Sequence, residues 1–413
     1  MTNKIATQEG SDSATQTHSK VSTPKQPLAG KPTNQNMPAS WLFNQVSQHA
    51  ASPFTVEFWD GQKYQLGGVG DPEFCLKIVR KEGLAALQSL DELRICEAYM
   101  AGDLDFDGDM LKLFDLQRAI STSHPIFNFI RWVRPKLFGQ LRGDKQAIST
   151  HYDYDHDFYL SFLDETRAYS QGVFEADDES LDVAMRRKLD FAIASCQLKP
   201  GMRVLDVGGG WGSFTEYAGQ QGIEVTSLTI SKQSFHYISN LIEQKNLPCK
   251  VIQQHFFEYV PEEKYDAVVI LGVMEHLPEY HRVVKQLQKV LRLDGRAYLD
   301  ASADTEQFST LFSPFMSRYI FPGNHCLLSI HDFIAAVQPS NLELLSVHND
   351  RHSYYLTLKA WARNLETAKA RIVERWGREL YCKFHLYFWG ACHNLLKNEI
   401  QAYRVVLQHN PVG

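Results

Sequence analysis

The chain has 413 residues, which is enough for two or three domains. Its 42 basic and 48 acidic side chains give a net charge of −6, so the sequence lacks the overall positive field that is typical of nucleic-acid-binding proteins. Seven cysteines without a C-x-x-C pair favour reduced thiols, and no apolar run is long enough to span a bilayer. These features predict a soluble cytoplasmic protein that does not bind nucleic acid.

The first part of the chain divides into a tail and a small domain. Residues 1–38 are mostly polar with few aliphatic side chains, which predicts a disordered tail. Residues 39–123 are predicted to form a small α+β domain, with a hairpin of strands at 54–59 and 63–66 and a helix over 82–101. The acidic segment 102–108 lacks the ligand positions of a calcium loop, so it predicts a plain turn and no metal site.

Residues 124–145 combine basic and aromatic side chains. Five basic residues stand against the single acid Asp144, and large apolar side chains lie between them. An anionic membrane surface attracts segments of this kind. The alternative is an interdomain linker whose aromatic side chains pack inward, and the sequence leaves both interpretations open.

From about residue 146 to 360, strand patterns alternate with helix patterns, which predicts an α/β domain with a parallel sheet. The expected strands cover 203–207, 224–230, 266–271 and 296–300. The expected helices cover 188–197, 213–220 and 282–291.

The strongest chemical signal is the glycine-rich segment 204–213. A buried strand leads into Gly208, Gly210 and Gly212, where a ligand can approach bare backbone at the carboxyl edge of the sheet. Asp206 precedes the first glycine, and no acid ends the second strand, unlike in a dinucleotide fingerprint. Asp206 suits an ammonium group or, indirectly, the sulfonium of a small cationic ligand such as S-adenosylmethionine, whereas it would repel a pyrophosphate. A dinucleotide is the alternative ligand.

Several blocks of the chain together resemble the cyclopropane fatty acid synthases and the related mycolic acid methyltransferases. The matching blocks are 151–164, 169–170, 198–212, 228–233, 272–276, 318–323 and 391–392. The resemblance implies a Rossmann-like S-adenosylmethionine methyltransferase domain over residues 146–413, with C-terminal helices at the acyl site. It also implies that residues 39–123 contact lipid or membrane.

The resemblance assigns the cofactor to particular positions. Tyr169 and Ser170 would contact its methionine part, and Gly208 and Gly210 would form the floor. Gly212 belongs to the same cofactor-binding turn. The ribose and adenine end would be held by Thr229, Gln233 and Phe256. An alternative for Thr229 and Gln233 is a helix cap and its first turn.

The catalytic end departs from the family pattern. Methyl transfer to an alkene leaves a carbocation, and in the family a bicarbonate held by Cys, Glu, His and Tyr removes the proton. Glu275 and Tyr354 match that pattern, but Gln171 replaces the cysteine and Asp300 replaces the histidine. Two carboxylates would repel a bicarbonate unless one is protonated.

Two hypotheses follow from this departure. Either Asp300 or Glu275 serves as the base, or the reaction ends differently and gives a methyl-branched or methylene chain. Asp300 as a simple turn cap is the structural alternative. Cys392 matches a family cysteine near the acyl site, although a buried thiol usually only packs.

The sequence therefore predicts methyl transfer from S-adenosylmethionine to an unsaturated acyl chain of membrane phospholipid, at the inner face of the membrane. One rival is a methyltransferase for a small soluble acceptor, and the other is a lipid- or cofactor-binding protein without turnover. Bicarbonate as a cofactor and a homodimer stay open.

Overall fold

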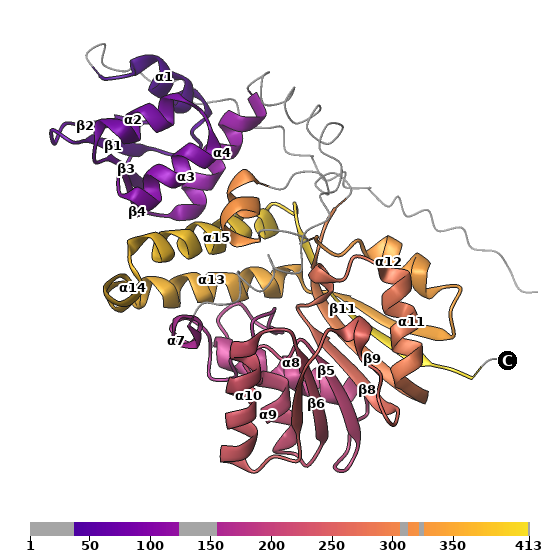
Figure 1. Cartoon of the computed structure of the whole chain (residues 1–413). Coiled ribbons are helices and arrows are strands. Elements are labelled where there is room, and N and C mark those ends of the chain that lie inside the picture. The colour runs from indigo at the N-terminus through magenta and orange to yellow at the C-terminus, as the bar shows by residue number, and fades with distance from the viewer. Residues whose placement is uncertain (1–36, 124–154, 306–312, 322–325, 412–413) are drawn as a thin grey trace, which may run out of the picture.

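The computed structural model describes residues 37–123, 155–305, 313–321 and 326–411 (Figure 1). The predicted basic-aromatic segment 124–145 and nearly all of the predicted tail lie outside these ranges. Met37 is an exception to the predicted tail boundary, because its side chain is only 3% exposed and belongs to the core of the N-terminal domain.

The N-terminal domain is a small mixed sheet with four helices. Its strands are β1 (Phe54–Phe58), β2 (Lys63–Leu66), β3 (Phe74–Ile78) and β4 (Leu104–Gly108). Its helices are α1 (Ser40–His49), α2 (Lys81–Gln88), α3 (Glu92–Ala101) and α4 (Met110–Ser123). The strands lie in the order β2-β1-β3-β4, and β1 runs parallel to β3. The predicted hairpin is confirmed as β1 and β2.

Two sequence predictions for this domain were wrong. The helix expected over 82–101 is broken between α2 and α3, where Leu90 takes a positive φ of 53° and Asp91 caps α3 by accepting from the Arg94 amide at 3.0 Å. The plain turn expected over 102–108 contains β4, which pairs with β3 and buries Leu104 against the core. Residues 104–108 form a strand because they pair with β3, and a local sequence pattern does not reveal this pairing.

The C-terminal domain is built on a seven-stranded, Rossmann-like sheet, so the predicted α/β class is confirmed. The strand order is β10-β11-β9-β8-β5-β6-β7. The strands are β5 (Arg203–Val207), β6 (Glu224–Thr229), β7 (Lys250–Gln253), β8 (Tyr265–Leu271), β9 (Leu291–Ala303), β10 (Leu342–Asn349) and β11 (Gln401–His409). The sheet is not fully parallel, because β11 runs antiparallel to both β9 and β10.

Helices cover the sheet and join it to the N-terminal domain. They are α7 (His156–Tyr159), α8 (Leu181–Ser195), α9 (Ser213–Gly219), α10 (Lys232–Lys245), α11 (Tyr280–Val290), α12 (Ile330–Val337), α13 (Arg351–Thr367), α14 (Lys369–Trp376) and α15 (Arg378–Leu396). Short helical turns lie at Phe256–Glu258, Met274–His276 and Met316–Ile320. No helix within the described ranges is both long and apolar enough to cross a bilayer.

Helix α8 begins seven residues earlier than the sequence predicted. Ser180 caps it by accepting from the Val183 amide at 3.4 Å. The helix then buries one stripe of side chains: Leu181, Ala184, Met185, Lys188, Leu189 and Ala192. Lys188 is therefore in the middle of the buried face, whereas the predicted helix 188–197 begins at this residue.

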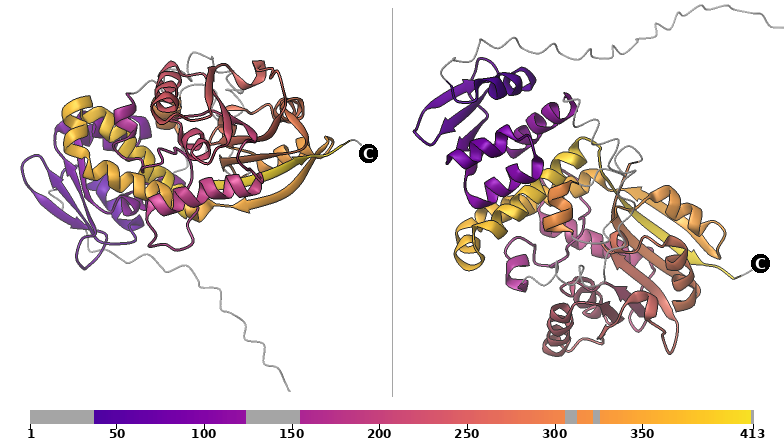
Figure 2. Two further views of the ribbon diagram at one scale, coloured as in Figure 1. Left: turned by 90° about the horizontal axis from the view of Figure 1, so that it is seen from below. Right: turned by 45° about the horizontal axis from the view of Figure 1, so that its top comes forward.

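Helices α13, α14 and α15 lie between the two sheets, as Figure 1 and the right-hand view of Figure 2 show. Helix α15 contacts α3 and α4 of the N-terminal domain on one side and α13 on the other. His385 on α15 hydrogen-bonds the Tyr99 hydroxyl of α3 at 2.9 Å. One hydrophobic cluster runs from the N-terminal sheet through these helices to the site described below.

Candidate active site

The glycine turn after β5 forms the floor of the site. A Cβ at Gly208 would lie 2.3 Å from a Val273 methyl, and a Cβ at Gly209 would lie 2.0 Å from the Ser227 hydroxyl. A Cβ at Gly210 would meet nothing closer than 3.9 Å, and this residue is exposed. The first two positions require glycine for packing, whereas the third leaves open space above bare backbone, where a ligand can approach.

Asp206 supports this turn from within the sheet. Its Oδ2 accepts hydrogen bonds from the Thr215 and Ser227 hydroxyls, both at 3.0 Å, and only 2% of the residue is exposed. Burial raises the pKa of Asp206 to about 6. The carboxylate thus connects β5, β6 and α9, which suits the indirect role toward a cationic cofactor that the sequence suggested.

Thr229 lies beside the turn at the end of β6. The amides of Gly208 and Gly209 donate to the Leu228 carbonyl at 2.8 and 3.0 Å, which fixes the two strand ends together. The cap of α10 is Ser231, which accepts from the Ser234 amide, so Thr229 is not the helix cap. Gln233 lies in the first turn of α10, as the alternative interpretation expected.

Phe256 follows β7 at the same edge of the sheet. Its ring is packed in the core, with 4% of the residue exposed, and its carbonyl accepts from Gln286 Nε2 at 2.9 Å. The predicted adenine contact of Phe256 stays a prediction.

Tyr169 and Ser170 approach from the other side. The Tyr169 ring centroid lies 5.1 Å from that of Trp361 on α13 and 5.5 Å from that of Tyr159. Ser170 is buried, and a Cβ at Gly272 would lie 2.9 Å from its own Cβ. The segment 169–170 therefore lies against the turn that follows β8.

These residues fit S-adenosylmethionine. The backbone at Gly210 is open to a ligand, and Ser213 Oγ just beyond is buried and has no hydrogen-bond partner among the described residues. The strand end at Thr229 offers a hydroxyl where a dinucleotide site has an acid. The negative charge of Asp206 beneath the turn opposes a pyrophosphate.

Glu275 lies at the other end of the site, in the turn Met274–His276 after β8. Its Oε1 accepts from the Ser302 amide at 2.8 Å and from the Ser302 hydroxyl at 2.7 Å. Its Oε2 is buried and has no hydrogen-bond partner among the described residues. Burial raises the pKa of Glu275 to about 7, and the charge of Asp300 contributes in the same direction.

Asp300 is held on both of its oxygens. Oδ1 accepts from the Gly272 amide at 2.8 Å, and Oδ2 lies 3.2 Å from Lys188 Nζ. Both charged side chains are completely buried, and Lys188 also donates to the Ser170 hydroxyl. The turn-cap interpretation therefore describes Oδ1, while Oδ2 belongs to an ion pair that the sequence analysis missed.

Lys188 was missed although a signal was present. The positions 181, 184, 185, 188, 189 and 192 repeat at helical spacing, and Lys188 is the only charged residue among them. A lysine inside an apolar stripe must find a partner when it is buried. The misplaced start of α8 concealed this stripe.

The other predicted catalytic residues converge on the same sheet edge from different elements. Gln171 is 1% exposed, its Nε2 donates to the Tyr403 carbonyl at 3.4 Å, and its Oε1 lacks a partner among the described residues. Tyr354 lies in the first turn of α13, and its amide donates to the Asp350 carbonyl at 2.8 Å.

Cys392 is set back from this group. It is completely buried on α15, and its thiol lies 3.8 Å from the Tyr355 carbonyl on α13. Burial raises the pKa of Cys392, so the thiol stays protonated. This environment is typical of a packing residue.

A wall of aromatic rings adjoins Tyr169. Ring centroids of Phe158 and Phe384 lie 4.7 Å apart, those of Phe162 and Phe388 lie 5.0 Å apart, and the Phe162 centroid is 6.1 Å from Tyr169. The rings come from α7, the loop after it and α15. Such rings can exclude water and stabilise a cation through their faces.

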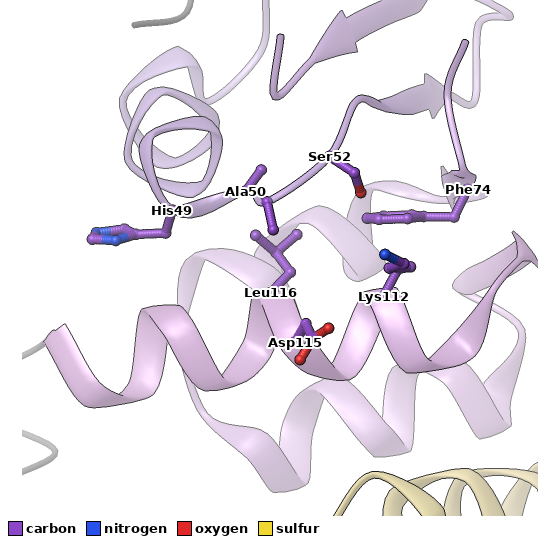
Figure 3. Close-up of a pocket in the computed structure, with 8 residues that line it drawn as sticks. His49, Ala50, Ser52, Phe74, Lys112, Asp115 and Leu116 are labelled. Carbon is purple, nitrogen blue, oxygen red and sulfur yellow. The ribbon is translucent and has the colours of Figure 1, made fainter. Parts of the chain in front are cut away.

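A small hollow in the N-terminal domain is separate from this site (Figure 3). It lies between α1, β3 and α4 and has a volume of about 20 Å³. A space of this size holds about one water molecule, so it cannot receive an acyl chain.

The fold and the glycine turn define an S-adenosylmethionine-dependent methyltransferase. The sequence profile of the mycolic acid cyclopropane synthetase family matches residues 140–405, and the chain belongs to that family. Residues 42–124 match a separate domain family whose function is unknown.

Three similar proteins share about a quarter of their residues with this chain. The chain is 28% identical to a probable fatty acid methyltransferase of Mycobacterium tuberculosis, over 81% of this chain and 84% of that protein. It is 26% identical to a probable fatty acid methyltransferase of Pseudomonas putida, over 86% and 91%. The solved structure of the cyclopropane synthase MmaA2 from Mycobacterium tuberculosis superposes with a TM-score of 0.60 at 25% identity, over 64% of this chain and 99% of that one.

Proposed function

We propose that this enzyme methylates the double bond of an unsaturated fatty acyl chain in membrane phospholipid and yields a cyclopropane or methyl-branched chain. The observation that carries the proposal is Glu275 Oε2, a buried carboxylate oxygen without a partner among the described residues, beside the cofactor edge. The names of its relatives, which include fatty acid methyltransferases and a cyclopropane synthase, support the acyl substrate.

The residues around the glycine turn, which we call the cofactor end of the site, would bind and orient S-adenosylmethionine. Tyr169, Ser170 and the open backbone at Gly210 would hold S-adenosylmethionine, with Thr229 and Gln233 at its ribose and adenine end. When bound, the cofactor supplies an electrophilic methyl group that the alkene attacks, which leaves a positive charge on the acyl chain.

Glu275 and the charged residues around it, which we call the proton end of the site, would complete the reaction by removing a proton. A buried carboxylate with a pKa near neutrality is suited to act as a general base at physiological pH. Burial raises the pKa of Glu275 to about 7, and the two hydrogen bonds from Ser302 fix one oxygen so that the other is free to receive a proton. Asp300 is less suited, because both of its oxygens are engaged.

The aromatic wall would enclose the reacting alkene. An alkene is a weak nucleophile, so it must be held close to the methyl group in a site from which water is excluded. The faces of Phe162 and Tyr169 would stabilise the positive charge until the proton leaves.

The N-terminal domain would bring the enzyme to the membrane. Trp41 and Trp59 are 53% and 39% exposed, and aromatic rings of this kind lie favourably at the boundary between water and lipid. We place the enzyme at the cytoplasmic face of the membrane, bound peripherally.

Lipid mass spectrometry of cells that express the protein tests the proposal. Monounsaturated phospholipid chains should gain one CH₂ unit, and double-bond analysis then separates cyclopropane from methyl-branched products. Cells that express the Glu275→Gln variant are the matched control and should lack the new lipid. Methylation of water-soluble acceptors in the absence of vesicles would favour the first rival, and cofactor binding without turnover on unsaturated vesicles would favour the second.

A further inference from the structure

The Lys188–Asp300 ion pair lies where the family resemblance places part of a bicarbonate site. Asp300 stands at the position of the histidine, and Gln171 stands at the position of the cysteine. The pair is completely buried, with 3.2 Å between Lys188 Nζ and Asp300 Oδ2. Lys188 also contacts Ser170, so the ion pair is connected directly to the segment expected to hold the cofactor.

A second buried pair adjoins the first. Arg404 on β11 lies directly opposite Asp300 on β9, and its Nη2 donates to Asp350 Oδ1 at 2.9 Å. The Arg404 guanidinium also lies over the Phe191 ring at 4.2 Å. The two cations and the two carboxylates balance one another, so neither cation has a net charge left for an additional anion.

Glu275 Oε2 and Gln171 Oε1 are buried acceptors without a partner among the described residues, whereas Arg404 Nη1 is a buried donor on a guanidinium already bound by Asp350. A bicarbonate has a single hydroxyl, so it could donate to only one of the two oxygens. An anion between these oxygens would lie near the negative charge of Asp300 and would gain no free cation. The residues present therefore do not fit a bicarbonate.

We propose that the Lys188–Asp300 ion pair takes the place of a bound bicarbonate, so that the proton leaving the acyl chain passes directly to Glu275. This inference rests on the proposed function. The C–H bond of the cation breaks, its electron pair forms the ring bond or a new double bond, and Glu275 Oε2 gains the proton. Lys188 is then a positioning residue that holds Asp300 in place.

The first test uses the purified full chain, S-adenosylmethionine and vesicles of dioleoylphosphatidylglycerol. We expect the wild-type rate to be the same in buffer freed of carbon dioxide and in buffer with added sodium bicarbonate. A loss of about a hundredfold on removing bicarbonate, restored by adding it, would overturn the inference. Absence of any product in both buffers would contradict the proposed function instead.

The second test measures binding and needs no turnover. In Asp300→Ala, Lys188 loses its partner beside a new space, and an anion should enter. Carbon-13 bicarbonate should then show saturable line broadening with Asp300→Ala, and bicarbonate should raise the melting temperature of that variant and restore part of its activity. Wild-type protein and the double variant Lys188→Met/Asp300→Ala should show neither binding signal.

The binding result decides the inference even if methyl transfer is not detected. Saturable bicarbonate binding by the wild type would overturn it. So would an Asp300→Ala variant that melts cooperatively but does not bind bicarbonate, or a double variant that binds as well as the single one.

Discussion

The two ends of the site are built in different ways. The cofactor end, from Gly208 to Thr229, uses bare backbone and neutral hydroxyls, with Asp206 as its buried acid. The proton end gathers five ionisable side chains from five separate segments of the chain: Lys188, Glu275, Asp300, Asp350 and Arg404. The first end depends on shape, and the second depends on charge balance.

The residues at catalytic positions that differ from the family pattern lie at the proton end of the site. In the proposed assignment, the two departures at catalytic positions, Gln171 and Asp300, belong to the proton end, while the cofactor end keeps its glycine turn and strand-end hydroxyl. A change in how the proton is removed can therefore occur without a change in how the methyl donor is held.

The largest expected effect comes from removing the proton acceptor. Glu275→Gln keeps an oxygen for the Ser302 amide but cannot accept a proton. We expect kcat to fall by about a hundred- to ten-thousandfold, the usual contribution of a general base. Product formation on unsaturated vesicles measures the loss, and calorimetry should give an unchanged affinity for S-adenosylmethionine.

Ser302→Ala is the matched control for this comparison. It removes one of the two hydrogen bonds to Glu275 Oε1 but leaves the carboxylate, so it should reduce kcat far less. If Glu275→Gln kept most of the activity, or if it lost cofactor affinity and kcat together, Glu275 would not be the base.

The next effect concerns stability at the proton end. Lys188→Met leaves the Asp300 carboxylate buried without its cation, and breaking a buried pair in this way costs about 3–5 kcal/mol. Arg186→Met is the control on the same helix, because the Arg186–Glu165 pair is exposed and contributes about 0–1 kcal/mol. Urea unfolding of both variants gives the difference, and equal losses would show that Lys188 is not held in a buried pair.

The cofactor end could be predicted from the sequence because its parts are local. A strand, a glycine turn and a helix follow one another within residues 203–219, and each leaves its own pattern. The same applies to Thr229, which ends the next strand. Parallel strands bring their carboxyl ends to one edge of the sheet, so the fold class alone predicts that Thr229 lies next to the glycine turn.

The proton end could not be predicted in the same way. Asp300 and Lys188 were visible as residues, but their pairing depends on where α8 begins and on which face it buries. Arg404 lies on β11, a strand that the sequence analysis did not assign, and its pairing with β9 joins segments about a hundred residues apart. The error at β4 has the same origin, because its pairing with β3 overrode a local pattern.

A smaller effect should come from filling the glycine turn. A Cβ on Gly209 would lie 2.0 Å from Ser227 Oγ, which is itself held by Asp206. We expect Gly209→Ala to destabilise the fold by about 1–3 kcal/mol, as overpacking usually does, and to weaken binding of S-adenosylmethionine. The double variant Gly209→Ala/Ser227→Ala removes the obstructing oxygen and should recover part of both losses; no recovery would mean that this contact does not limit the turn.

The smallest expected effect is a shift in pH dependence that links Asp300 to Glu275. Burial raises the pKa of Glu275 to about 7, with the Asp300 charge adding to it and Ser302 opposing it, so kcat should rise as the pH passes through this value and the base loses its proton. Asp300→Asn removes the negative charge but keeps an oxygen for the Gly272 amide. The pKa of Glu275 should fall, and the rising limb of the kcat profile should move to lower pH by up to about one unit, since one unit corresponds to about 1.4 kcal/mol between the protonation states.

Cys326, which also lies against Glu275, is protonated in this range because burial raises the pKa of its thiol to about 11, and Cys326→Ser should leave the limb in place. A limb that stays fixed or moves upward in Asp300→Asn would show that the two carboxyl groups do not share one electrostatic site.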